Sequence, residues 1–236
     1  MDLAELGVNS FVALFALIDP VGNVPIFAAA THGATPAQRR LVAFYIALFG
    51  TVFLAFFYFT GMAMLQFFGI SLSAFRIAGG VLLFLLGLDM SRSDFLASFG
   101  DAERPAGEAP VGLFAYAQRR FERMVVPFAM PLLIGPGAIS TAILQASEAA
   151  RYGPAGLAVG AAAIVAVGFA TVIAFMLTGP ITRILGRIGM AIVVKVLGLI
   201  LCAMAVQFIL TGVSDATHGV ILRAVAQPYA KTAAHH

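Results

Sequence analysis

Six long apolar stretches constrain this chain more than any other feature of its sequence. A helix needs about 20 mostly apolar residues to cross the hydrocarbon core of a bilayer, and each stretch has about that length. The stretches are Val8 to Ala30, Leu41 to Met64, Leu72 to Met90, Val125 to Ser147, Ala155 to Thr178 and Met190 to Val213. Charged residues make up only 11% of the chain, too few to cover the surface of a soluble domain. We therefore predict an all-α polytopic membrane protein with six transmembrane helices and the lipid bilayer as its solvent.

The distribution of bases predicts three parts and an orientation. Residues 1–90 hold three spans, residues 91–124 form a polar loop, and residues 125–236 hold three more spans. When the connections are assigned alternately to the two sides, most bases fall on one side. That side holds Arg39, Arg40, Arg92, Arg104, Arg119, Arg120, Arg123, Arg183 and Arg187, and the other holds Arg151, Arg223 and Lys231. Because bases concentrate in cytoplasmic loops, we predict an inner-membrane protein with a cytoplasmic central loop and both termini outside.

The two halves of the chain resemble each other weakly. Residues 59–61 end the second stretch in Phe-Thr-Gly, and residues 177–179 end the fifth in Leu-Thr-Gly, 118 positions later. A base three positions before a glycine recurs at Arg76 and Lys195, 119 positions apart. Ile-Asp-Pro-Val-Gly at 18–22 and Ile-Gly-Pro-Gly at 134–137 are 116 positions apart. Chance matching in glycine-rich helices is the alternative. With three spans per half, the second half enters the membrane from the opposite side, so the pattern predicts two inverted three-helix repeats.

The first stretch is interrupted near its middle by Asp19-Pro20-Val21-Gly22-Asn23-Val24-Pro25. Each proline removes a backbone donor and clashes with the carbonyl four residues earlier, so Pro20 and Pro25 predict a broken helix. The fourth stretch carries Gly135, Pro136 and Gly137 at the matching place, followed by Ser140 and Thr141, and we expect it to break at Pro136 as well. A broken backbone at this depth is tolerated where it is buried in protein or lines a wet cavity.

Paired breaks in corresponding spans predict a solute site, because interrupted helices form the binding sites of many secondary transporters. The helix that resumes after a break offers free N–H groups and a positive dipole end, which suit a carboxylate. Close backbone approach is expected at Gly22, Gly135 and Gly137, and side-chain hydrogen bonds are expected from Asn23, Ser140 and Thr141. The alternative is a pair of proline kinks that only shape the bundle.

Asp19 and Lys195 lie well inside predicted spans and each has two interpretations, whereas Arg76 lies near the start of its span and is expected to extend its guanidinium to the membrane surface. Asp19 either binds a solute ammonium or a proton, or it accepts bonds from the freed N–H groups around it. Lys195 either extends its ammonium to the membrane surface, or it pairs with an acid inside the bundle. Nothing else in the chain predicts chemistry. Enzyme motifs and metal-ligand clusters are absent from the sequence, and the bases cluster at span ends rather than in a surface for nucleic acid. We expect no enzyme activity, no metal and no cofactor.

The residues around the breaks resemble a known family. Residues 14–27, Leu-Phe-Ala-Leu-Ile-Asp-Pro-Val-Gly-Asn-Val-Pro-Ile-Phe, and residues 131–140, Pro-Leu-Leu-Ile-Gly-Pro-Gly-Ala-Ile-Ser, are similar to the first-span and fourth-span signatures of the MarC integral membrane proteins. Residues 76–80 and 87–88 also fit the third span of that family. The family includes the archaeal small neutral amino acid transporters (SnatA). The resemblance implies a six-span inner-membrane protein that transports glycine- or alanine-sized solutes, coupled to Na⁺ or H⁺.

Together these observations predict a secondary transporter for small neutral amino acids or similarly small polar solutes. Two alternatives remain at this point: an uncoupled exporter or channel for small metabolites, and a membrane scaffold that transports nothing.

The orientation is tested by a cysteine placed at Ser98 of the central loop, in a chain whose own Cys202 is replaced by alanine. We expect a membrane-impermeant thiol reagent to label it only after the inner membrane is permeabilised, because the arginine-rich side faces the cytoplasm. Labelling in intact spheroplasts would reverse the orientation.

Overall fold

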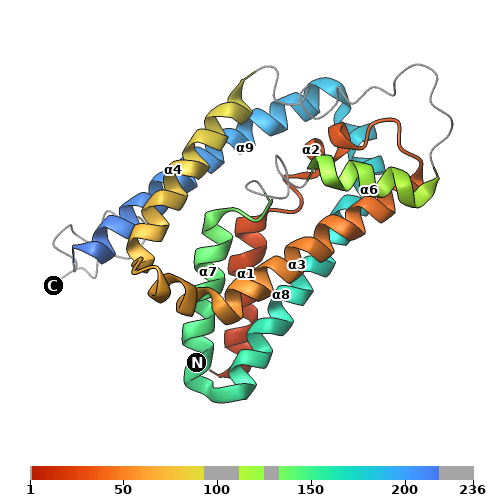
Figure 1. Cartoon of the computed structure of the whole chain (residues 1–236). Coiled ribbons are helices and arrows are strands. Elements are labelled where there is room, and N and C mark those ends of the chain that lie inside the picture. The colour runs from red at the N-terminus through yellow and green to blue at the C-terminus, as the bar shows by residue number, and fades with distance from the viewer. Residues whose placement is uncertain (1, 93–111, 125–132, 218–236) are drawn as a thin grey trace, which may run out of the picture.

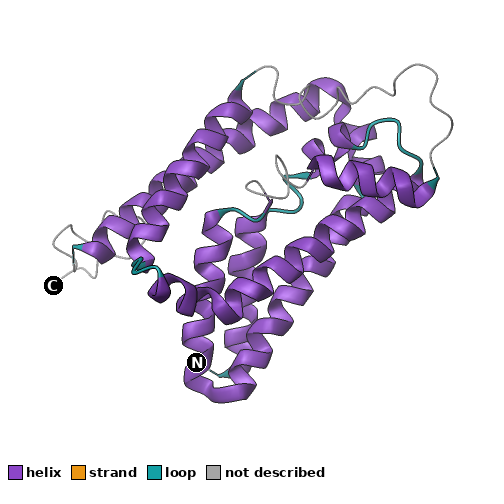
Figure 2. Cartoon of the chain, viewed as in Figure 1, coloured by secondary structure: helices purple, strands orange, loops and turns teal. Residues whose placement is uncertain are grey.

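The computed structural model describes residues 2–92, 112–124 and 133–217, and every regular element in those ranges is a helix (Figures 1 and 2). The first half of the described chain holds α1 (Leu3–Ile18), α2 (Val24–Ala30), α3 (Pro36–Phe67) and α4 (Leu72–Ser91). The second half holds α6 (Leu113–Met124), α7 (Pro136–Ala149), the 3-10 turn η2 (Ala150–Tyr152), α8 (Gly153–Met176) and α9 (Thr178–Ala216). The predicted all-α class is confirmed for these residues.

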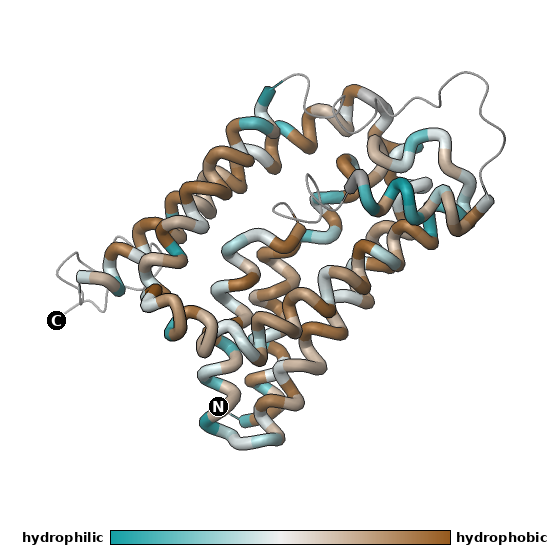
Figure 3. Tube along the Cα trace, viewed as in Figure 1, coloured by the Kyte–Doolittle hydropathy of each residue, from teal (hydrophilic) through white to brown (hydrophobic). Residues whose placement is uncertain are grey.

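Four helical stretches in the described ranges are long and apolar enough to cross a membrane. They are Pro36–Phe67, Leu72–Ser91, Pro136–Met176 and Ile188–Ala216, and Leu3–Ile18 is a shorter apolar helix. Figure 3 shows hydrophobic residues along these helices and a more hydrophilic α6. Residues 125–132, the first third of the predicted fourth span, lie outside the described residues. The lengths and hydropathies agree with a polytopic membrane protein.

Capping residues explain where several helices begin. Asp2 accepts a hydrogen bond from the N–H of Glu5 and starts α1, and Thr35 does the same with Gln38 at the start of α3. Both are reciprocal capping boxes, which satisfy N–H groups that have no partner inside the helix. Ser71 accepts from the N–H of Ala74 and starts α4. The connection before it passes through Gly69, whose φ of 66° needs a residue without a Cβ.

Two elements differ from the sequence-based expectation. The segment expected as a polar loop contains α6, an amphipathic helix too polar to register as a span. Its Phe121 ring lies edge-on to the rings of Tyr45 and Phe49 on α3, and this contact holds α6 in place. The sixth predicted span also differs. Its helix, α9, starts early, at Thr178, and its helical backbone is interrupted at Gly186, where φ is 60°, before the spanning part begins at Ile188.

The helix pair α4 and α9 lies along one flank and packs antiparallel (Figure 1). Arg76 in the first turns of α4 forms an ion pair of 2.6 Å with Asp215 in the last turn of α9. At the other end, Gly87 on α4 approaches Gly198 and Cys202 on α9 closely. In a bilayer, small residues allow helices to approach and gain van der Waals contact where no hydrophobic force drives association.

Two further pairs pack antiparallel in the remaining bundle (Figure 1). Gly160 on α8 lies against Tyr58 on α3, and Gly168 lies against Thr51. Residue numbers therefore rise along α8 in the direction in which they fall along α3, so the two helices are antiparallel. Gln145 near the end of α7 donates to the carbonyl of Ser10 in α1. In the described chain α1 therefore contacts α7, α3 contacts α8 and α4 contacts α9.

The α4–α9 contact can be tested by adding one methyl group. A Cβ at Gly198 would lie 2.8 Å from the carbonyl oxygen of Gly87 and 2.9 Å from Cβ of Met90, so Gly198→Ala overpacks the interface at a cost of about 1–3 kcal/mol. We expect a lower unfolding temperature in detergent. Gly179→Ala is the control, because nothing lies within 4 Å of a Cβ there. Equal unfolding temperatures for the two variants would contradict this packing.

Candidate functional site

The first helix break covers residues 19–23, between α1 and α2, as the sequence predicts. Asp19 is the C-cap of α1 and adopts the left-handed conformation, with φ 42° and ψ 64°. Among the described non-glycine residues it alone has a positive φ, and a short polar side chain tolerates that conformation better than most. Its N–H still donates to the carbonyl of Phe15 at 2.9 Å. Pro25 lies in the first turn of α2, where proline is compatible with a helix, so it helps start α2 rather than break it.

Two side chains satisfy the backbone groups that this break exposes. Asp19 Oδ1 accepts the N–H of Gly22 at 3.0 Å. Asn23, only 6% exposed, donates its Nδ2 to the carbonyls of Ile18 at 2.9 Å and Asp19 at 3.1 Å. The Asp19 carboxylate therefore accepts a freed N–H group, which is the second of the two interpretations of this residue. The Asn23 amide closes the other side of the loop.

Gly22 makes the close approach expected of it, but its neighbours are protein atoms. A Cβ at Gly22 would run into the carboxylate of Asp19 and lie 2.7 Å from a methyl group of Leu197 on α9. The same holds for Gly137 on α7, where a Cβ would lie 2.9 Å from the Phe208 ring. In this conformation both glycines serve packing, and a larger residue at either position would disturb the fold as well as a bound solute.

At the second predicted break α7 begins at Pro136 with Gly135 as its N-cap, and residues 125–132, which would form the preceding part of the span, lie outside the described residues. Gly135 has extended dihedrals, φ −72° and ψ 168°, and as the N-cap it has no side chain to cap the helix. Gly79 on α4 packs directly on the Pro136 ring. Ser140, one turn further on, is 1% exposed, and its hydroxyl has no hydrogen-bond partner among the described residues. Thr141 beside it is half-buried.

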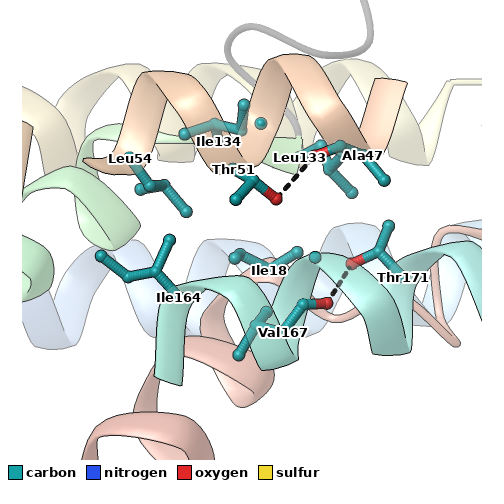
Figure 4. Close-up of a pocket in the computed structure, with 11 residues that line it drawn as sticks. Ile18, Ala47, Thr51, Leu54, Leu133, Ile134, Ile164, Val167 and Thr171 are labelled. Carbon is teal, nitrogen blue, oxygen red and sulfur yellow. Dashed lines mark hydrogen bonds between the residues drawn. The ribbon is translucent and has the colours of Figure 1, made fainter. Parts of the chain in front are cut away.

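A small cavity lies between α3 and α8, next to both breaks (Figure 4). Ile18 from the end of α1 and Leu133 and Ile134 from just before Gly135 reach it together. Its polar lining comes from Thr51 and Thr171, which donate to the carbonyls of Ala47 and Val167 on their own helices at 2.8 Å and 2.9 Å. The cavity has room for about one water molecule.

A second small cavity lies on the α4–α9 side of the same breaks. Its walls include the apolar side chains of Leu17, Leu83, Leu201 and Met204, and its remaining lining is Gly135, Gly137 and Ala138 at the start of α7. It also has room for about one water molecule. The uncapped N-terminus of α7 therefore faces an apolar cavity.

The structure brings the two predicted breaks together at these cavities. Gly135 and Gly137 line the second cavity, while Asp19, Gly22 and Asn23 form the closed loop beside it. Sequence analysis missed Thr51 and Thr171. The sequence did carry a signal for them: Thr51 directly follows Gly50, and Thr171 lies one turn after Gly168, both in spans without any charge.

Lys195 on α9 has an exposed side chain, and it lies two residues before Leu197, which approaches Gly22 of the first break. Gly198, one turn later, packs on Met90 and Ser91 at the end of α4, so Lys195 is level with the end of that helix. This position favours a side chain that extends to the membrane surface. Arg76, expected to do the same, pairs with Asp215 instead.

Comparison with known proteins agrees with this architecture. The model of the MarC family integral membrane proteins matches residues 5–217. The chain belongs to the MarC family. It is 35% identical to a UPF0056 membrane protein of Methanocaldococcus jannaschii over 92% of this chain and 99% of that one. It is also 32% identical to the UPF0056 membrane protein YhcE of Escherichia coli, over 89% of this chain and 93% of the relative. No solved structure matches the chain. The predicted family membership is thereby confirmed.

The first break depends on the Asn23 amide in this MarC protein, and Asn23→Ala tests that. The carbonyl of Ile18 would lose its donor in a buried loop, at a cost of about 1–3 kcal/mol, so we expect a clear fall in unfolding temperature. Thr60→Ala is the control, because the Thr60 hydroxyl donates to a carbonyl of its own helix. A fall no larger than that of the control would show that the loop closes without Asn23.

Proposed function

We propose that this protein is a secondary transporter of small neutral amino acids of glycine or alanine size, built as two inverted three-helix repeats. One observation carries the proposal. Two helix breaks meet at the centre of the bundle, and among the described residues only the first is filled by a protein carboxylate, that of Asp19. The other break keeps an uncapped helix N-terminus against a cavity.

The packing supports the inverted repeat. When two halves are related by a two-fold axis in the membrane plane, matching helices can cross at that axis and then run antiparallel. The described helices do this in the pairs α3–α8 and α4–α9. At an offset of 116, α1 corresponds to residues 119–134, of which 125–132 lie outside the described residues. Near the middle of the last pair, the Cys202 thiol lies 3.7 Å from the carbonyl oxygen of Phe84, a residue 118 positions earlier. That separation equals the one between the matching Thr-Gly segments at 60–61 and 178–179.

The repeat also matches the two breaks residue by residue. At an offset of 116, Asp19 corresponds to Gly135 and Gly22 corresponds to Ala138. In the first break the Asp19 carboxylate accepts the N–H of Gly22. In the second break Gly135 has no side chain to accept the N–H of Ala138, and Ala138 lines the cavity. A solute carboxylate at this place would take the position that Asp19 takes in the first repeat.

The chemistry at the start of α7 suits such a group. The first helical N–H groups carry the positive end of the helix dipole and attract anions. Ser140 adds a buried hydroxyl without a partner among the described residues, and its Cα–Cβ bond tilts toward the start of the helix. The walls of the cavity are Leu and Met side chains, so a bound solute meets apolar surface beyond its carboxylate.

The small volume supports selection for the smallest amino acids. Both cavities accept about one water molecule in this conformation, so a solute enters only when the helices around them separate. A side chain larger than a methyl group would need further displacement of Leu83, Leu201 or Met204. The two cavities lie on different sides of the breaks within the bundle, one between α3 and α8 and the other toward α4 and α9.

Gly135→Asp tests the proposed carboxylate position. An Asp at 135 can accept the Ala138 N–H as Asp19 accepts that of Gly22, and its charge would repel a solute carboxylate. We expect at least a tenfold loss of glycine affinity, or about 1.4 kcal/mol. The affinity is measured from the rise in unfolding temperature that glycine causes. Gly135→Ala is the matched control, because it adds only a Cβ in a conformation open to alanine. Equal loss in both variants would assign the effect to size rather than charge.

Transport itself is tested with purified protein in proteoliposomes. We expect labelled glycine or alanine to accumulate when an inward Na⁺ or H⁺ gradient is imposed, and to stop accumulating when the gradient is collapsed. Equilibration that is independent of any gradient would indicate an uncoupled channel or exporter. No flux above protein-free liposomes would reject transport of these solutes.

A further inference from the structure

Arg120 on α6 is a buried arginine without a counter-ion in the described part of the chain. Its relative exposure is 9%, and its Nε is fully buried with no hydrogen-bond partner. A guanidinium stays protonated in proteins, so burial cannot be relieved by loss of the charge. A buried charge is stable only when an opposite charge or hydrogen-bond acceptors accompany it. The position of Arg120 therefore indicates an anion.

The packing of α6 fixes this burial. Phe121 next to Arg120 places its ring between those of Tyr45 and Phe49, with centroids 5.9 Å apart in both contacts. Ala117, one turn earlier, is fully buried. Residues 117, 120 and 121 share one face of the helix, so the contact with α3 draws Arg120 inward with its neighbours.

Among the described residues, α3, on which α6 packs, carries a second partly buried base, and no acid pairs with either arginine. Arg39 in the first turn of α3 is half-buried, and its Nε also has no partner. Its Nη2 reaches only the carbonyl of Thr31, at 3.5 Å. The acid nearest to Arg120 in sequence is Glu122, which is exposed and accepts a bond from Gln118. Among the described residues neither guanidinium forms an ion pair.

We propose that Arg120 holds the phosphate of an anionic lipid headgroup where α6 packs against α3, the helix that also carries Arg39. A guanidinium binds phosphate through two parallel hydrogen bonds. A lipid is favoured over a soluble anion because α6 is amphipathic. Its first turn exposes Leu113 and Phe114, at 39% and 68%, which suits an in-plane helix at the boundary of headgroups and acyl chains.

The test compares unfolding temperatures in nanodiscs of phosphatidylcholine alone and of an equimolar mixture with phosphatidylglycerol. We expect phosphatidylglycerol to stabilise the parent protein, and Arg120→Gln to lose at least half of that gain. Arg92→Gln is the matched control, since it removes an exposed arginine that is paired with Asp89, and it should keep the gain. Arg120→Lys, which keeps the charge without the two-pronged geometry, should retain part of the gain and serves if Arg120→Gln does not fold.

Three outcomes would overturn the proposal. Equal gains for Arg120→Gln and Arg92→Gln would show that the lipid acts through surface charge in general. A gain for Arg120→Lys equal to that of the parent would show that positive charge is sufficient and that the guanidinium geometry is not needed. Stabilisation by inorganic phosphate in phosphatidylcholine discs, equal to that by phosphatidylglycerol, would assign the site to a soluble anion instead of a lipid.

Discussion

A backbone that stops being helical inside a bilayer must find new partners for its polar groups, and this requirement governs the centre of the protein. Water is not available in the hydrocarbon core, and each unpaired N–H or C=O group there costs several kcal/mol. The first break meets the requirement with two side chains, Asp19 and Asn23. The second break has no side-chain cap at Gly135. The difference between the two breaks leads directly to the proposed function.

The rest of the bundle keeps these breaks enclosed. Glycines at 160 and 168 bring α8 against α3, and glycines at 87 and 198 bring α9 against α4. The resulting contacts surround the breaks on two sides, and two small cavities lie beside the breaks. Interfaces made of small residues gain no hydrophobic energy in lipid and can therefore separate and re-form at moderate cost. A transporter that must open alternately to two sides needs contacts of this kind.

Sequence patterns predicted the all-α class, the long apolar helices and the interruption at residues 19–23, because these follow from local chemistry. Charge-free runs and prolines can be read directly from the sequence. The non-helical residues 19–23 and the helix start after Gly135 lie at the positions that the prolines predict. α6 was not predicted, since a search for long apolar stretches passes over a short amphipathic helix whose Phe121 finds its partners on α3. The ion pair of Arg76 with Asp215 joins residues 139 positions apart, and such pairings depend on the antiparallel packing. The solute site is predicted only in outline, because Gly22 and Gly137 contact protein atoms that no local pattern identifies.

The most direct test of the central claim is a distance between a bound solute and the start of α7. Solid-state NMR of the protein in lipid, with ¹⁵N at the Ala138 amide and ¹³C in the carboxylate of bound glycine, measures that distance by dipolar dephasing. A carboxylate that accepts this N–H lies within about 4 Å of the nitrogen, so the account predicts strong dephasing that excess unlabelled glycine removes. Displaceable glycine that shows no dephasing from Ala138 would place the solute elsewhere and contradict the account.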